Sequence, residues 1–142
     1  MIIEPQKSAD GARVGDKDAI FQLCDRVRET AFALHRFLRH GHLEKVYENG
    51  LAARLRKNGL CVEQQHALQV RDEDGTVLGN YVADLFVENT LIVELKACRI
   101  LADEHVAQLL CYLRACHIEH GLLINFGGSK LQIRKYAFSE AA

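Results

Sequence analysis

Two short apolar runs, separated by three residues, decide the fold: Tyr81-Val82-Ala83-Asp84-Leu85-Phe86-Val87 and Leu91-Ile92-Val93-Glu94-Leu95-Lys96-Ala97. Both runs are typical of strands. The link Glu88-Asn89-Thr90 predicts a tight turn, because Asn tolerates the left-handed backbone conformation that such a turn needs. Antiparallel pairing across this turn places Val87 opposite Leu91 and Asp84 opposite Glu94.

Three ionisable residues inside these apolar runs need an explanation, since buried charges are costly unless they are paired or bind a metal. Glu94 and Lys96 are two residues apart and share one face of a strand. Asp84, directly opposite Glu94, projects to the same side. The pattern predicts a divalent-metal site beside a positive group, which suits phosphodiester cleavage. The alternative is a structural salt bridge from Lys96, for which one carboxylate would suffice.

Length and composition indicate an ordinary globular protein. The chain has 142 residues, of which 49% are hydrophobic and 26% charged, and its net charge is −1. This size fits one domain. The charge argues against non-specific coating of nucleic acid. A local basic groove remains open, formed by Lys130, Arg134 and Lys135 or by Arg54, Arg56 and Lys57, although solvated surface charge explains both clusters equally well.

Targeting and redox signals point to a cytoplasmic protein. No apolar run approaches the roughly 20 residues of a membrane span, and residues 1–7 lack the features of a signal peptide. The five cysteines have no paired spacing and are expected to be reduced. A zinc site is disfavoured, because no C-x-x-C occurs and the candidate ligands point around several sides of a helix; these are His105, Cys111, Cys116 and His117.

The pattern along the chain predicts an α/β fold in a single domain over residues 17–142, after a flexible lead over residues 1–16. Helices are expected at about 18–38, 43–58 and 102–117. Strands are expected at about 62–70, from the turn at 72–75 through 87, and at about 91–97, 121–126 and 131–138. The first three strands form an antiparallel meander, and the strand after the helical crossover joins parallel to one of them. The result is a central mixed sheet flanked by helices.

Helical spacing adds further candidates. Glu44 shares a face with Tyr47, although an acid in the first turn of a helix is also favoured by the macrodipole. Gln108 and Tyr112 are one turn apart on one face, with His105 on the turn before. An ordinary polar flank is the alternative for this group.

The segment Gly41-His42-Leu43-Glu44-Lys45-Val46-Tyr47 matches the signature G-x-x-E-x-x-Y. Together with the segments around Asp84, Glu94 and Gln108, it makes the chain similar to small GxxExxY proteins of the PD-(D/E)XK nuclease superfamily, from about Ile20 to Tyr136. The resemblance implies a restriction-endonuclease-like core with a metal-dependent phosphodiesterase site.

Carried over by position, the resemblance gives a role to each of the charged residues Glu44, Asp84, Glu94 and Lys96. Glu44 is the acid on the helix, and Asp84 and Glu94 are the metal carboxylates. Lys96 is the motif lysine, which orients the nucleophile or stabilises charge on the phosphate. The backbone carbonyl of Leu95 is expected to join the metal ligands.

The remaining candidates concern substrate. Gln108 and Tyr112 resemble the Q-x-x-x-Y motif of RecB-like nucleases, and with His105 and Tyr47 they are expected to bind or position substrate. The expected cofactor is Mg²⁺, with Mn²⁺ able to substitute, since hard oxygen ligands suit these ions. The expected function is a nuclease acting on nucleic acid, DNA ahead of RNA.

The rival hypothesis keeps the nuclease fold without turnover, as a nucleic-acid-binding, regulatory or protein-interaction module. A chain this short leaves little room for a specificity domain. Specificity is therefore expected to come from a homodimer or a partner protein, and no membrane is expected among the partners.

Overall fold

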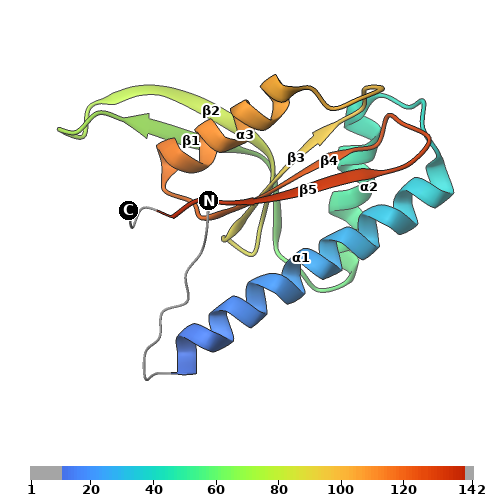
Figure 1. Ribbon diagram of the computed structural model, residues 1–142, viewed down its shortest axis with the longest axis horizontal. Helices are drawn as coiled ribbons and strands as arrows, with labels where there is room; N and C mark the ends of the chain where they lie inside the picture. The colour runs from blue at the N-terminus through green and yellow to red at the C-terminus, as the bar shows by residue number, and fades with distance from the viewer. Residues whose placement is uncertain (1–10, 140–142) are drawn as a thin grey trace.

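The computed structural model describes the backbone of residues 11–139 and the side chains of residues 18–139. Over this part of the chain a five-stranded mixed sheet is flanked by three helices (Figure 1). The elements are α1 (Gly11–Leu38), α2 (Glu44–Lys57), β1 (Val62–Arg71), β2 (Val77–Val87), β3 (Leu91–Lys96), α3 (Asp103–Cys116), β4 (His120–Asn125) and β5 (Gln132–Ala137). The predicted α/β class and element order are confirmed.

The start of α1 corrects one prediction. The helix begins at Gly11, whereas the sequence pattern predicted a flexible lead up to residue 16 and a helix from Asp18. Each residue added to an existing helix gains a hydrogen bond at little further cost, so the helix tolerates Gly15 as an isolated weak helix former. The rest of the predicted lead, residues 1–10, lies outside the described residues.

Turn chemistry sets the bounds of α2. Gly41 has a φ of 113°, and Arg39, two residues earlier, a φ of 63°, so the chain leaves the helical conformation between α1 and α2. Glu44 stands in the first turn of α2, where the helix dipole favours an acid. After the C-cap Asn58, Gly59 takes a φ of 87° and ends the helix as predicted.

The sheet has the strand order β1-β2-β3-β4-β5. β1, β2 and β3 form the predicted antiparallel meander, β4 lies parallel to β3, and β5 is antiparallel to β4. The tight turn between β2 and β3 pairs Val87 with Leu91, as predicted. Glu88 and Asn89 both adopt positive φ, at 52° and 54°, and Thr90 N–H closes the turn on the carbonyl of Val87.

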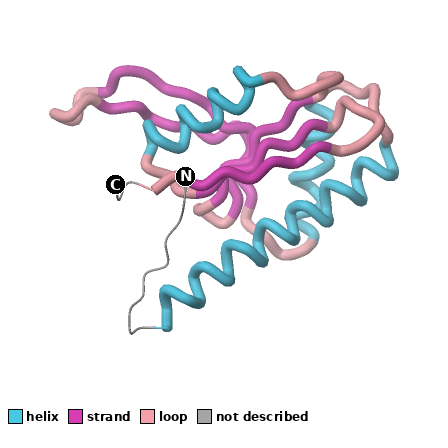
Figure 2. Tube along the Cα trace, in the orientation of Figure 1, coloured by secondary structure: helices cyan, strands magenta, loops and turns pink. Residues whose placement is uncertain are grey.

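Two hydrophobic clusters lie on opposite faces of the sheet. The larger joins α1 and α2 to alternate residues of β3, among them Val93 and Leu95. The smaller joins α3 to the other face of β3 through Ile92. Figures 1 and 2 show α3 on one side of the sheet and α1 on the other, with the β1–β2 hairpin extending past the end of β3. Within the described residues, no helix has the length and apolar character needed to cross a membrane.

Candidate active site

The centre of the site is the point at which β2 and β3 separate. Their pairing runs from Val87 back to Leu85↔Val93. Beyond this pair, hydrogen bonds from backbone N–H groups to side-chain carboxylates connect the two strands. Oε2 of Glu94 accepts a hydrogen bond from the N–H of Asp84, and Oδ2 of Asp84 accepts one from the N–H of Leu95, both at 2.8 Å. The predicted opposition of Asp84 and Glu94 is thus realised through reciprocal side-chain bonds.

The electrostatics of this pair are those of crowded, poorly solvated carboxylates. Glu94 is 5% exposed. Burial, followed by repulsion from Asp84, raises the pKa of Glu94 to about 8. Burial also raises the pKa of Asp84, although the hydrogen bond from Leu95 opposes the rise. The surroundings therefore disfavour the charged forms of both groups in the metal-free protein.

Lys96 lies beside this pair but is not bound to it. Burial raises the pKa values of Asp84, Glu94 and Glu44, and the positive charge of Lys96 partly opposes each rise, which places its ammonium within electrostatic reach of all three. Among the residues that the structure describes, Lys96 forms no ion pair with either Asp84 or Glu94. The structural salt bridge weighed as an alternative is therefore not formed.

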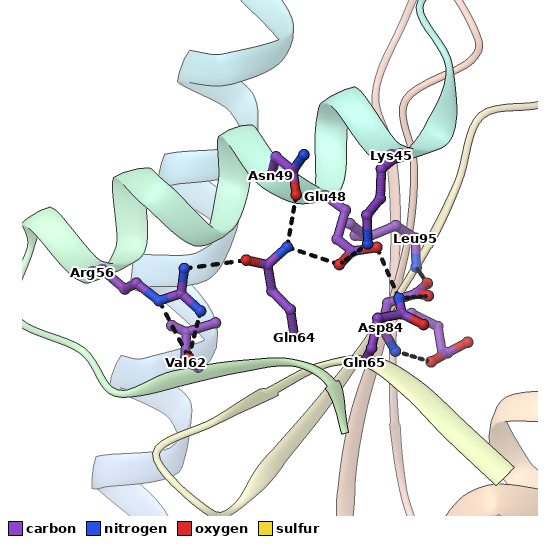
Figure 3. A network of polar contacts seen from close by, with 10 residues as sticks. Lys45, Glu48, Asn49, Arg56, Val62, Gln64, Gln65, Asp84 and Leu95 are labelled. Atoms are coloured by element: carbon purple, nitrogen blue, oxygen red, sulfur yellow. Dashed lines mark hydrogen bonds and ion pairs between the residues drawn. The ribbon is translucent and has the colours of Figure 1, made fainter. Parts of the chain in front are cut away.

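Two acids on α2, Glu44 and Glu48, lie one turn apart and near Asp84. Together with Asp84 and Glu94 they form the acidic cluster. Glu44 is exposed, and desolvation, followed by repulsion from Asp84, raises its pKa. Glu48, which sequence reasoning missed, is 3% exposed. Its Oε2 accepts hydrogen bonds from Lys45 at 3.1 Å and from Gln64 at 2.8 Å (Figure 3). The i, i+4 spacing of Glu44 and Glu48 was the available signal, since such residues share a helical face.

Gln65 is the second residue that sequence reasoning missed. β1 pairs with β2 at Gln64↔Leu85 and again at His66↔Ala83, and the intervening Gln65 adopts a φ of 51°. Positive φ is uncommon for a non-glycine residue. This kink interrupts the strand directly opposite Asp84, and no sequence pattern announces it.

Two of the predicted substrate-positioning residues on α3, Tyr112 and Gln108, differ in burial. Tyr112 is 8% exposed and stacks on Tyr81 of β2 with ring centroids 4.9 Å apart. Burial, followed by the charges of Glu94 and Asp84, raises the pKa of its phenol, so Tyr112 lies close to the acidic cluster. Gln108 is exposed, one turn earlier on the helix.

The other two predicted positioning residues make structural contacts. Nδ1 of His105 accepts a hydrogen bond from the N–H of Ala102 at 3.0 Å and so caps the start of α3. Tyr47 is fully buried, and its hydroxyl donates to the carbonyl of Arg39 at 2.5 Å. Its ring stacks on Phe126 at 4.7 Å. Tyr47 therefore fixes the segment before α2, and the structure does not bring it to the acidic cluster.

The chain leaving β3 is held by Asn125, which is fully buried. Its Oδ1 accepts hydrogen bonds from the N–H groups of Cys98 and Gly127, both at 3.0 Å, and its Nδ2 donates to the carbonyl of Cys98 at 2.9 Å. A Cβ on Gly127 would lie 2.2 Å from the carbonyl oxygen of Cys98, so only glycine fits there. These contacts fix the backbone directly after Lys96.

The donor set fits a hard divalent cation. The pKa values of Asp84, Glu94 and Glu44 are all raised, chiefly by burial, with repulsion from another carboxylate of the cluster among the further causes. Carboxylate oxygens are the ligands that Mg²⁺ and Mn²⁺ prefer. In the described part of the chain, no three Asp, Glu, His or Cys side chains already stand in position to hold a metal ion. Cation binding would therefore involve side-chain adjustment.

Comparison with known proteins agrees with this architecture. The family described as the PD-(D/E)XK nuclease superfamily matches residues 21–136. The chain is similar to a solved structure titled "Crystal structure of SSO0001", with a TM-score of 0.54 and 21% identity over 68% of this chain. The match spans 52% of that longer chain, so it speaks for the fold alone. No curated protein matches.

The family match extends over most of the chain, and the five-stranded mixed sheet with its flanking helices is consistent with the core of that superfamily. The protein belongs to the PD-(D/E)XK nuclease superfamily.

Proposed function

We propose that this protein is a Mg²⁺-dependent nuclease that hydrolyses phosphodiester bonds of nucleic acid. The observation that carries the proposal is the reciprocal pairing of Asp84 and Glu94, with Lys96 beside them and free of an ion pair to either. A structural ion pair would have consumed this lysine. An unpaired ammonium beside crowded carboxylates suits a substrate that brings its own negative charge.

The carboxylates hold the cation in this proposal. Asp84 and Glu94, with the backbone carbonyl of Leu95, are the ligands, and Glu44 completes the set from α2. A divalent cation, when bound, makes water a better nucleophile and neutralises charge that develops on the phosphate. Mn²⁺ is expected to replace Mg²⁺.

The neighbouring side chains act on nucleophile and substrate. The ammonium of Lys96 orients the attacking water or stabilises the phosphate oxygens, both of which need a fixed positive donor. Tyr112 lies within electrostatic reach of Glu94 and Asp84 and orients the substrate phosphate or Lys96. Gln108, exposed on α3, is assigned to contact with the nucleic acid farther from the reacting bond.

A binding or regulatory module without turnover is the second candidate. One oxygen of Asp84 and one of Glu94 already accept backbone hydrogen bonds, and within the described residues no metal-holding group of three stands ready. Such an arrangement also suits a fold that keeps its acids for structural reasons. In either case, we expect a homodimer or a partner protein to supply specificity.

A cleavage panel decides between the two candidates. Purified protein is incubated with single- and double-stranded DNA and RNA, in Mg²⁺, Mn²⁺ or EDTA. Asp84→Asn and Glu94→Gln serve as matched variants. Cleavage that needs the cation and disappears in both variants supports the nuclease. Binding of nucleic acid without cleavage in any cation supports the module.

A further inference from the structure

The kink at Gln65 brings two consecutive side chains to the same partner. In a regular strand, neighbouring side chains point to opposite faces of the sheet. Here, the amide nitrogens of Gln64 and Gln65 both donate to the carboxylate of Glu48 on α2, at 2.8 Å and 2.9 Å (Figure 3). A positive φ at a residue such as glutamine persists where the surrounding structure holds it, often at functional sites.

Gln65 also reaches the centre of the acidic cluster. Its Nε2 lies 2.9 Å from Oε1 of Glu48 and 3.4 Å from Oδ1 of Asp84. A side-chain amide has two N–H donors, so it can direct one to each carboxylate. The nitrogen of Gln65 thus lies within hydrogen-bond distance of two carboxylate side chains, one from α2 and one from β2.

The second oxygen of each carboxylate is anchored elsewhere. Oε2 of Glu48 accepts from Lys45 and Gln64, and Oδ2 of Asp84 accepts from the N–H of Leu95. One oxygen of each acid is therefore held by its own surroundings, and the other converges on Gln65. Two anchored carboxylates whose remaining oxygens point at one nitrogen also suit a hard divalent cation, which takes carboxylate oxygens as ligands.

We propose that the amide nitrogen of Gln65 occupies a cation position between Glu48 and Asp84, and that Gln65 sets the cation affinity of the site by competing for these two oxygens. This inference rests on the proposed function, because it concerns the same site. Gln65 is a positioning residue in this scheme. Its side chain is exposed and has room to turn away when a cation binds, leaving Glu48 as an additional ligand.

The test measures cation binding in the absence of substrate. Gln65→Met keeps the size of the side chain and removes both hydrogen bonds. We expect its dissociation constant for Mn²⁺, from titration calorimetry, to be roughly fivefold lower than that of the wild type, because the competing hydrogen bonds to charged groups are gone. Its melting temperature in EDTA should fall, since two carboxylates lose a shared donor. An unchanged or weaker affinity for Mn²⁺ would overturn the inference.

Gln64→Met is the matched control. Gln64 donates to the same Glu48, and its hydrogen bonds within the described part of the chain do not include one to Asp84. Its loss should lower the melting temperature in EDTA while leaving Mn²⁺ affinity near that of the wild type. Equal tightening in both variants would show that freeing Glu48 alone is sufficient, against the bridging role of Gln65.

A second variant covers the case in which Gln65→Met does not fold. Gln65→Glu keeps the shape of the side chain and replaces the donor with a negative group, so Mn²⁺ should raise its melting temperature by more than that of the wild type. If the wild type binds Mn²⁺ and cleaves, but no Gln65 variant shifts affinity, the inference fails and the proposed function stands. Tighter binding in the variants without any cleavage supports the inference and removes the nuclease. Absence of cation binding in all proteins overturns both.

Discussion

The backbone N–H of Asp84 donates a hydrogen bond to Oε2 of Glu94 at 2.8 Å, across the point where β2 and β3 separate. The reciprocal bond runs from the N–H of Leu95 to Asp84. Beyond the last pair of the β2–β3 ladder, each acid therefore accepts a hydrogen bond from a backbone N–H that has no backbone partner on the neighbouring strand. A buried N–H without any partner would cost free energy. The same two side chains are the proposed cation ligands, so fold and site share these atoms.

Near-isosteric removal of charge from this pair should separate fold from function. Asp84→Asn and Glu94→Gln keep an oxygen that can accept the backbone hydrogen bond. We expect both variants to fold, and to melt at or above the temperature of the metal-free wild type, because repulsion falls. Cleavage should drop by more than the about 10–100-fold that loss of an outer-shell partner costs. Circular-dichroism melting and a cleavage assay measure the two effects. Unfolding of either variant together with normal turnover by its folded fraction would point to a structural pair.

Lys96 should matter for turnover and not for cation binding. We expect Lys96→Ala to lower the cleavage rate by about 100- to 1000-fold, the cost typical of losing one electrostatic stabiliser of the transition state. Its Mn²⁺ affinity should be equal to that of the wild type or tighter, because a neighbouring positive charge is removed. Lys96→Arg, as the control, keeps the charge and should retain part of the rate. Loss of Mn²⁺ binding in Lys96→Ala would contradict the assigned role.

The raised pKa of Glu94 predicts how the stability of the metal-free protein depends on pH. Its pKa rises from 4.5 to about 8 on folding, chiefly through burial. Between these values the folded state binds a proton that the unfolded chain releases, so this contribution to stability is lost as pH rises through the window. Urea unfolding in EDTA, from about pH 5 to pH 8, should show that the free energy of unfolding of Glu94→Gln increases relative to that of the wild type as pH rises. Parallel stability curves would argue against a buried, crowded carboxyl.

His120 should act in the opposite direction, on the acid side. Burial, followed by the charge of Lys135, lowers its pKa to about 4 from 6.5, so the unfolded chain binds a proton that the folded state does not. This contribution to stability is lost as pH falls through that window. Its buried Nδ1 has no hydrogen-bond partner in the described part of the chain. His120→Leu should therefore raise the free energy of unfolding by about 1 kcal/mol at neutral pH, and by more at about pH 5. Urea unfolding at both pH values measures this, and an equal effect at both would contradict it.

The order of the elements and the tight turn between β2 and β3 could be predicted from the sequence, because both depend on local patterns. Apolar periodicity distinguishes helix from strand, and Asn89 marks a turn whose geometry pairs Val87 with Leu91. Continuing that register along the two strands is enough to set Asp84 opposite Glu94. The start of α1 was the exception, because helix propagation overrode the weak helix former Gly15.

The candidate site was predicted only in part. The acids on neighbouring strands come together through local pairing, whereas Glu48 and Gln65 meet across 17 residues of sequence. A helical carboxylate with polar neighbours resembles any exposed acid until packing shows that it is buried. In the same way, Tyr47 and His105 look like functional residues in the sequence, and their hydrogen bonds show them fixing the chain before α2 and the start of α3.

The sequence by itself determined the strands and the turn, because strand alternation and turn geometry act within a few residues. Only the tertiary structure decided that Gln65 leaves the strand conformation and directs its amide to Glu48 and Asp84. The physical reason is that a positive φ at glutamine is unfavourable locally. It is maintained by hydrogen bonds to two carboxylates from distant parts of the chain, and no local pattern encodes them.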